Sequence, residues 1–160
     1  MSQSPNRPIR RRIEGFRGGH KLHGLALDEA LIVQLPHAMS PAYEAVHTLL
    51  QGAKRPTAIV AMGTNILNDT LNAINASGLR IPHDISVVSI GDPDFAAHHV
   101  PPISSLRVDL DRVAELGSEL LLSRMRGEAG DAPRSVHVSN SFVERASCGP
   151  APQRARRRAS

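Results

Sequence analysis

The sequence predicts an α/β fold, with three α/β/α layers built around a mostly parallel sheet. Its central stretch, residues 57–111, alternates short apolar runs with a helix-length segment and with loops containing glycine, proline and acidic residues. Strands that are joined by a helix-length crossover run parallel. Open sheets of this kind bind ligands at the carboxyl ends of their strands, so the loops at residues 63–65 and 91–94 are candidate binding loops.

The first half of the chain contains five expected elements. They are a short helix over residues 11–22, a buried strand over 31–35, a helix over 41–51, a strand over 58–62 and a helix over 65–77. Ser40 and Pro41 fit the N-cap and first turn of the second helix, where proline loses no hydrogen bond. Gly78 fits the end of the third helix, because glycine readily adopts the left-handed conformation found there.

The second half is expected to complete the sheet. We expect strands over residues 85–90 and 104–108, a helix that runs to residue 126, a loop over 127–133 and one or two strands within 136–145. The 85–90 run is almost entirely apolar, which is typical of a parallel strand covered on both faces. Asp109 or Asp111 can cap the long helix, because a carboxylate accepts hydrogen bonds from the free amides of a first turn.

Charge and composition narrow the classes of function. The formal net charge is +4, but eight of the arginines lie at the two ends of the chain, and acidic residues outnumber basic ones between them. The sequence therefore does not predict a folded nucleic-acid-binding face. We expect disordered basic ends at residues 1–10 and 149–160 around one domain at 11–148. With no apolar run of membrane-spanning length and no signal-peptide pattern, we expect a cytoplasmic protein with no membrane partner.

Several motifs occur in the order and spacing of one known family. They are the Pro-Thr-Ala-Ile-Val-Ala strand at residues 56–61, the helix end and turn at 76–82, the strand start at 84–88, the Pro-Pro-Ile-Ser-Ser run at 101–105 and the leucine-containing helix at 113–126. From about residue 11 to 147, the chain resembles the effector-binding core of the lactose/galactose-repressor (LacI/GalR) family of bacterial transcription regulators. The resemblance implies one lobe of a Rossmann-like, periplasmic-binding-protein-like type I fold.

The same resemblance implies parts that this sequence does not contain. Family members begin with a helix-turn-helix headpiece and continue into a two-lobed core, whereas this chain matches the second lobe. We expect a truncated reading frame, a misplaced start or a gene remnant, the alternative being a deliberately short regulator. In the family the helix at 113–126 packs in the first lobe, so we expect its apolar face to be poorly covered. Operator DNA would be bound only through the headpiece.

The resemblance implies three effector-binding residues, Arg12, Asp92 and His37. Arg12 precedes Gly15 in the family's Arg-x-x-Gly-aromatic pattern, and the alternative is a solvated arginine in a basic run. Asp92 follows a buried strand, where a carboxylate can accept hydrogen bonds from vicinal hydroxyls or base nitrogens. An ungapped comparison, however, puts Gly91 at the position of the family's ligand-holding aspartate. The alternative is that Asp92 is an aspartate of a turn. His37 falls where the family places a side chain against the effector ring, and the alternative is a solvated loop histidine.

The resemblance also implies dimer contacts at Leu67, Leu71 and Phe95, because family dimers pair through the corresponding helix and loop. The alternative is that these side chains are buried in the chain's own core. Cys148 is the only cysteine, and the eight histidines lack the partners of a metal site, so we expect no metal. The sequence contains neither a phosphate-binding loop nor a nucleophile elbow, so we expect no cofactor and no enzymatic activity.

The sequence is compatible with several functional interpretations. The resemblance implies the effector-binding portion of a transcriptional regulator, with a sugar-like or purine-like effector and a homodimer in the intact protein. The alternatives are a periplasmic-type sugar-binding protein, which the missing signal and the 2% aromatic content disfavour, and a non-functional gene remnant. A doubly wound enzyme that uses a nucleotide or flavin is a further hypothesis, because fold does not determine function, and cofactor absorbance would identify it.

Overall fold

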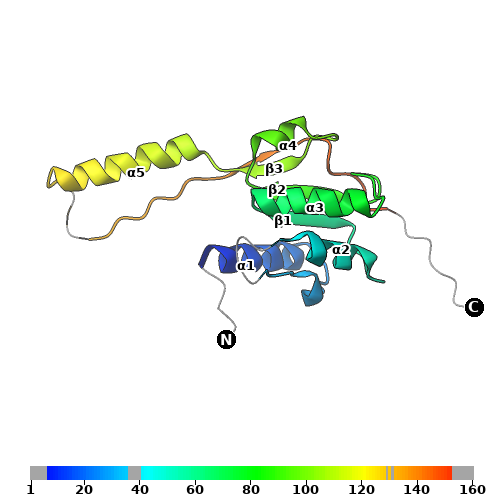
Figure 1. Cartoon of the computed structure of the whole chain (residues 1–160). Coiled ribbons are helices and arrows are strands. Elements are labelled where there is room, and N and C mark those ends of the chain that lie inside the picture. Colours follow the sequence, from blue (N-terminus) through cyan, green and yellow to red (C-terminus); the bar gives the residue numbers. More distant parts are fainter. Residues whose placement is uncertain (1–6, 36–40, 129, 131, 153–160) are drawn as a thin grey trace, which may run out of the picture.

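The computed structural model describes residues 7–35, 41–128, 130 and 132–152, and Figure 1 shows a small sheet with helices around it. The helices are α1 (Arg7–Leu22), the 3₁₀ turn η1 (Glu29–Leu31), α2 (Tyr43–Gln51), α3 (Thr64–Ala76), α4 (Asp94–His98) and α5 (Leu110–Met125). The strands are β1 (Ala58–Met62), β2 (Ser86–Ile90), β3 (Ser104–Arg107) and β4 (Ser141–Val143).

The sheet has the strand order β1-β2-β3-β4. β1 runs parallel to β2, and β2 runs parallel to β3, whereas β4 adds to β3 in the antiparallel direction. α3 forms the crossover from β1 to β2, and the segment containing α4 leads from β2 to β3. The predicted α/β class with a mostly parallel sheet is confirmed. The carboxyl ends of the three parallel strands consequently lie at one edge of the sheet.

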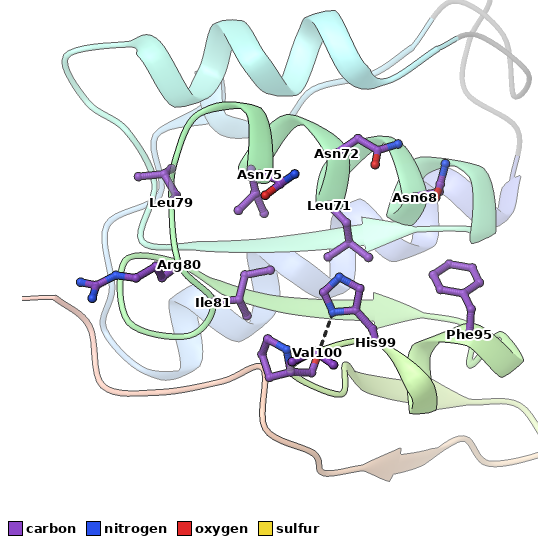
Figure 2. A pocket seen from close by; sticks show the side chains of 12 residues that line it. Asn68, Leu71, Asn72, Asn75, Leu79, Arg80, Ile81, Phe95, His99 and Val100 are labelled. Atoms are coloured by element: carbon purple, nitrogen blue, oxygen red, sulfur yellow. Dashed lines mark hydrogen bonds between the residues drawn. The ribbon is translucent and has the colours of Figure 1, made fainter.

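The core lies between α3 and the sheet. In Figure 2, α3 lies in front of the strands and α1 runs behind them, which gives the three expected layers. The largest fully buried side chains include Leu67 and Ile74 of α3 and Ile85, Val87 and Ile103 of the sheet region. Burying an aliphatic side chain of this size contributes about 1.5–3 kcal/mol. These side chains pack α3 against the sheet.

α1 begins earlier than the sequence predicts. The expectation that residues 7–10 are disordered is wrong, since they form the first turn of this helix. Pro8 suits a first turn, and Arg10 Nε lies 3.7 Å from Glu14 Oε1 one turn later. Ile13 is the buried side chain of the helix. The expected helix at 11–22 is otherwise confirmed.

The expected strand at residues 31–35 is wrong. Leu31 belongs to η1, which Asp28 caps by accepting a hydrogen bond from the Ala30 amide at 3.1 Å. A strand needs a hydrogen-bonded neighbour, and among the described residues β1 pairs on one side only, with β2. The apolar run therefore has the composition of a buried strand but lacks the pairing that would make it one.

α2 starts two residues later than expected. Its N-cap position is Ala42, without a side-chain cap, and Ser40 lies outside the described residues. The Ala42 amide instead donates to Asp69 Oδ2 at 2.7 Å, which ties the start of α2 to α3. The cap comes from a residue 27 positions away, so local pattern could not identify it.

α5 extends away from the sheet, and residues 132–140 return beside it without regular structure (Figure 1). Asp109 caps the helix, with Oδ1 accepting a hydrogen bond from the Arg112 amide at 2.9 Å. Leu110, Leu121 and Met125 are 71%, 60% and 74% exposed. The expectation of a poorly covered apolar face is confirmed. β4 occupies only three of the residues expected to form one or two strands.

The last described segment is attached to β2 and β3 through Ser147. Its buried hydroxyl donates to the Val87 carbonyl at 2.6 Å and accepts a hydrogen bond from the Ser104 amide at 2.8 Å. Gly149 continues the attachment by donating its amide to Ser86 Oγ at 3.1 Å. Ordered structure thus extends past residue 148, where the disordered tail was expected to begin; residues 153–160 lie outside the described part.

Candidate functional site

The loops at the carboxyl ends of β1 and β2 each contain a glycine with a positive φ angle. Gly63 follows β1 with φ 116°, and Gly91 follows β2 with φ 101°. Backbone of this kind is open to glycine and strained for other residues. The Gly91 amide donates to the Leu106 carbonyl at 2.9 Å, which holds the loop against the end of β3. The turn presents Asp92 directly beyond the edge of the sheet.

Asp92 lies at the centre of a cluster of two arginines. Arg145 Nη1 donates to Asp92 Oδ1 at 2.7 Å, and Arg145 Nη2 donates to Oδ2 at 3.0 Å. Arg107, the last residue of β3, donates to the same Oδ2 through Nε at 2.8 Å and Nη2 at 2.6 Å. We call Gly91, Asp92, Arg107 and Arg145 the strand-end site. It joins the ends of two parallel strands to the segment that follows β4.

The electrostatics of the strand-end site keep all three side chains charged. The hydrogen bonds from Arg145, which have the largest effect, and from Arg107 hold the pKa of Asp92 well below its usual range, against the opposing effect of burial. The hydrogen bond to Asp92 likewise raises the pKa of Arg145. Arg145 Nη1 also donates to the Ile103 carbonyl at 2.6 Å, so its guanidinium is fixed from both sides.

The structure places the three predicted effector-binding residues differently. Asp92 is at the strand-end site, with its side chain 5% exposed. Arg12 is exposed on α1, and no other described residue bonds to its side chain. The N-terminal end of α1 points to the side of the sheet from which α5 leaves (Figure 1). His37 lies outside the described residues.

Sequence analysis missed Arg107 and Arg145. Arg107 falls at the end of an expected strand, next to an acidic loop in the expected sheet, and this position was a usable signal. Arg145 bonds to a residue 53 positions earlier in the chain, and no local pattern links the two. The aspartate predicted as a ligand-holding group thus has two arginine partners.

A second concave surface lies between α3 and α4, which we call the α3–α4 groove. It has a volume of about 320 Å³. Figure 2 shows Asn68, Asn72 and Asn75 along α3 above the apolar floor of the groove, with Phe95 and His99 on its other wall. His99 Nδ1 lies 2.9 Å from the Pro101 carbonyl oxygen, which fixes the imidazole ring.

The three residues predicted to contact a second copy of the chain are buried to different extents near this groove. Leu67 is fully buried in the chain's own core, so its side chain has no surface to offer a partner. Leu71 is 8% exposed and lines the groove, and Phe95 is 37% exposed at its rim. Phe95 is the predicted residue best placed for contact with another molecule.

Across residues 7–35, 41–128, 130 and 132–152, no three histidine, cysteine or acidic side chains gather closely enough to hold a metal ion. None of the described helices has the length and apolar character needed to cross a membrane.

Most of this chain is similar in sequence to known proteins. The profile of the periplasmic binding protein-like domain matches residues 1–148. The HTH-type transcriptional repressor PurR of Yersinia enterocolitica is 29% identical over 147 residues, which are 92% of this chain and 43% of that protein. The lactose operon repressor of Rhizobium radiobacter is 35% identical over 105 residues, which are 66% of this chain and 91% of that sequence.

A solved structure is similar in fold as well as in sequence. It is the crystal structure of a sugar-binding transcriptional regulator of the LacI family from Escherichia coli, complexed with phosphate. It superposes with a TM-score of 0.76 at 26% identity and covers 95% of this chain and 53% of that one. The chain thus spans about half the length of the PurR repressor and of this regulator.

Proposed function

Because this chain belongs to the LacI/GalR family of transcriptional regulators and carries the family's periplasmic binding protein-like domain, we propose that it forms the effector-sensing portion of such a regulator. The observation that carries the proposal is the strand-end site, a hydrogen-bonded charged cluster at the carboxyl edge of a parallel sheet. Open α/β sheets bind small molecules at this edge. The ligand would be a sugar-like or purine-like metabolite.

Three residues are proposed to serve the effector. Asp92 anchors the strand-end site through its two arginines. Arg12 offers a guanidinium that no described residue occupies, and such a planar set of donors suits hydroxyl, carboxylate or phosphate groups. His37 remains a proposed contact for the effector ring.

In the intact regulator, binding would act on DNA indirectly. An effector that favours closure of two lobes would change the spacing of the DNA-binding headpieces. Operator binding would depend on that headpiece, so we expect these 160 residues to bind operator DNA without sequence preference. The relatives are transcriptional regulators rather than enzymes, and we propose the same, cytoplasmic, role for this protein.

The α3–α4 groove is proposed as the surface that pairs two copies. Its apolar floor and the half-exposed Phe95 support this assignment, and Leu71 would contribute at the floor. Leu67 would act only by holding α3 in place. Sedimentation of wild type and of a Phe95→Asp variant tests the proposal, which predicts a dimer and a monomer respectively; two identical sedimentation coefficients would contradict it.

A thermal-shift screen of the chain against sugars and purines tests effector sensing. A ligand that binds only the folded state raises its stability by about 2.7 kcal/mol at one hundred times its Kd, which is a shift of several degrees. The shift should disappear in an Asp92→Asn variant. Asp84→Asn is the matched control, because Asp84 is also bonded to an arginine, Arg80, but outside the strand-end site. Equal shifts in wild type and Asp92→Asn would contradict the proposed site, and no shift from any compound would contradict effector sensing.

A further inference from the structure

We infer that the effector of this protein carries an anionic group, a phosphate or a carboxylate, and that Arg107 binds it. The inference rests on the proposed effector-sensing function and deepens it by naming the class of ligand. Arg107 would be the residue that touches the ligand, whereas Asp92 and Arg145 would hold Arg107 in position. Three observations at the strand-end site lead to this assignment.

The first observation is that Asp92 has little acceptor capacity left for a ligand. Its Oδ1 accepts one hydrogen bond from Arg145, and its Oδ2 accepts three, two from Arg107 and one from Arg145. A carboxylate offers about two lone-pair sites on each oxygen, so Oδ2 is saturated, and the Asp92 side chain is only 5% exposed, which leaves little of Oδ1 open to a ligand. The hydroxyls of a neutral sugar both donate and accept hydrogen bonds, and their donors need such an acceptor. The strand-end site therefore does not provide what a neutral sugar would require from Asp92.

The second observation is the surplus of positive charge. Two guanidinium groups surround one carboxylate, and the exposed fractions of the Arg107 and Arg145 side chains are 55% and 14%. Arg145 is further occupied by the Ile103 carbonyl and by Ser105 Oγ. The Nη1 group of Arg107 has no hydrogen-bond acceptor among the described residues. The surplus charge thus faces solvent through Arg107.

The geometry of Arg107 suits an oxyanion. Because Nε and Nη2 are both bonded to Asp92 Oδ2, the plane of the guanidinium is fixed before any ligand arrives. An arginine that is already oriented loses little side-chain entropy on binding, and its donors match the oxygens of phosphate or carboxylate. A fixed arginine of this kind is a poor partner for a ligand that presents only donors.

The third observation is the space beside Gly91. A Cβ atom at this position would meet no atom within 4 Å, so the loop leaves room above the end of β2. Glycine also brings no negative charge to the site. Of the other acidic residues that follow β2 and β3, Asp94 is exposed at the start of α4, and Asp109 Oδ1 is bonded to the Arg112 amide at the start of α5. The acidic side chain that contacts Arg107 is therefore Asp92 alone among the described residues.

Calorimetric titration with three ligands of one carbon skeleton tests the inference. D-glucose is neutral, D-gluconate carries a carboxylate and D-glucose 6-phosphate carries a phosphate, and all are titrated into the full chain at constant ionic strength. Hydrogen bonds to charged groups contribute enough for us to expect at least one anionic ligand to bind roughly ten- to a hundredfold more tightly than glucose. Whichever anion binds more tightly identifies the group, phosphate or carboxylate.

Variants assign the effect to Arg107. Arg107→Gln should remove the advantage of the anion over glucose, and Arg107→Lys should retain part of it. Arg80→Gln is the matched control, since Arg80 also bonds an aspartate through Nε but lies outside the strand-end site. Circular dichroism melting curves establish that each variant is folded.

The outcomes separate this inference from the proposed function. If glucose binds as tightly as both anions, or if Arg107→Gln binds the anions as wild type does, the inference is wrong and effector sensing stands. If wild type is folded and neither these ligands nor the sugar and purine screen gives binding, both proposals are wrong. An equal loss in Arg80→Gln and Arg107→Gln would mean general attraction to a basic surface and would also overturn the inference.

Discussion

The sheet with α3 and the arm formed by α5 contrast within one short chain. Leu67 and Ile74 of α3 are fully buried against the sheet, whereas Leu121 and Met125 of α5 are largely exposed. Both helices have apolar residues at helical spacing and both end in a regular way. The difference is that α3 has the sheet as a partner, while α5 and residues 132–140 extend away from it (Figure 1).

This contrast shows that helical pattern and helical packing are separate properties. Sequence pattern predicts α5 and names Asp109 as one of two candidate caps, but it does not supply the surface that covers its apolar face. Large exposed apolar faces on folded proteins are typical of protein–protein contact sites. We expect the arm to respond to mutation as a surface and the sheet region as a core.

The largest expected difference is between matched truncations in the two regions. Leu67→Ala removes a fully buried side chain and should lower the free energy of unfolding by about 2–5 kcal/mol. Leu121→Ala changes an exposed position of α5 and should alter it by less than about 0.5 kcal/mol. Urea denaturation measures both. Similar losses would mean that α5 packs against the rest of the chain in solution.

The second-largest effect is expected from acid, which should weaken the strand-end site. Since the folded state lowers the pKa of Asp92, its contribution to stability is complete above the unfolded value of about 3.9 and is lost as the pH falls below it. Asp92→Asn should cost roughly 1–3 kcal/mol at neutral pH, because Arg107 is half exposed and its share is screened by solvent. Denaturation curves from pH 6 to pH 2.5 should show a smaller acid loss in the variant. Parallel acid limbs would contradict the pairing.

A smaller effect is expected at the start of α5. Asp109→Ala removes the side chain that accepts a hydrogen bond from the Arg112 amide and should destabilise the first turn by about 1 kcal/mol. Amide hydrogen exchange should accelerate at residues 110–113 while the amides of β2 keep their protection. Faster exchange in β2 would show that the arm and the sheet unfold together, and would contradict the expectation that they respond separately.

The smallest effect on stability is expected at the end of the arm. Met125→Gln replaces an exposed apolar side chain of α5 and should change the free energy of unfolding by less than about 0.5 kcal/mol. It should nevertheless lower the fluorescence of a dye that binds apolar surfaces, because the exposed apolar area becomes smaller. Unchanged fluorescence would indicate that the apolar face of α5 is covered in solution.

The limits of sequence prediction follow the same division between local and distant partners. β1 and α3 are predicted almost to the residue, because Gly63 and Gly78 mark their boundaries and each has strong local periodicity. Residues 31–35 are predicted wrongly, since an apolar run forms a strand only if a neighbouring strand pairs with it. The short α4 was expected to be a loop, because five residues give too little periodicity to indicate a helix.

The candidate site was predictable only in part. The carboxyl edge of the sheet and Asp92 follow from the alternation of elements and from the acidic loop. The arginine partners do not, because Arg107 and Arg145 lie 15 and 53 positions from Asp92 in sequence. Whether a carboxylate is free to bind a ligand depends on such distant partners, so the electrostatic character of the site becomes visible only in the fold.

Mapping of a bound ligand by NMR is the most direct test of effector sensing at the strand ends. The amides of Gly63, Gly91 and Asp92 and the side-chain Nε–H of Arg107 should shift in wild-type protein on addition of the tightest ligand from the calorimetric series. Resonances of the α3–α4 groove, whose lining includes Leu79, Arg80 and Ile81, and of the adjoining residues 82–84 should stay in place. Shifts confined to this surface, with none at the strand ends, would contradict the account.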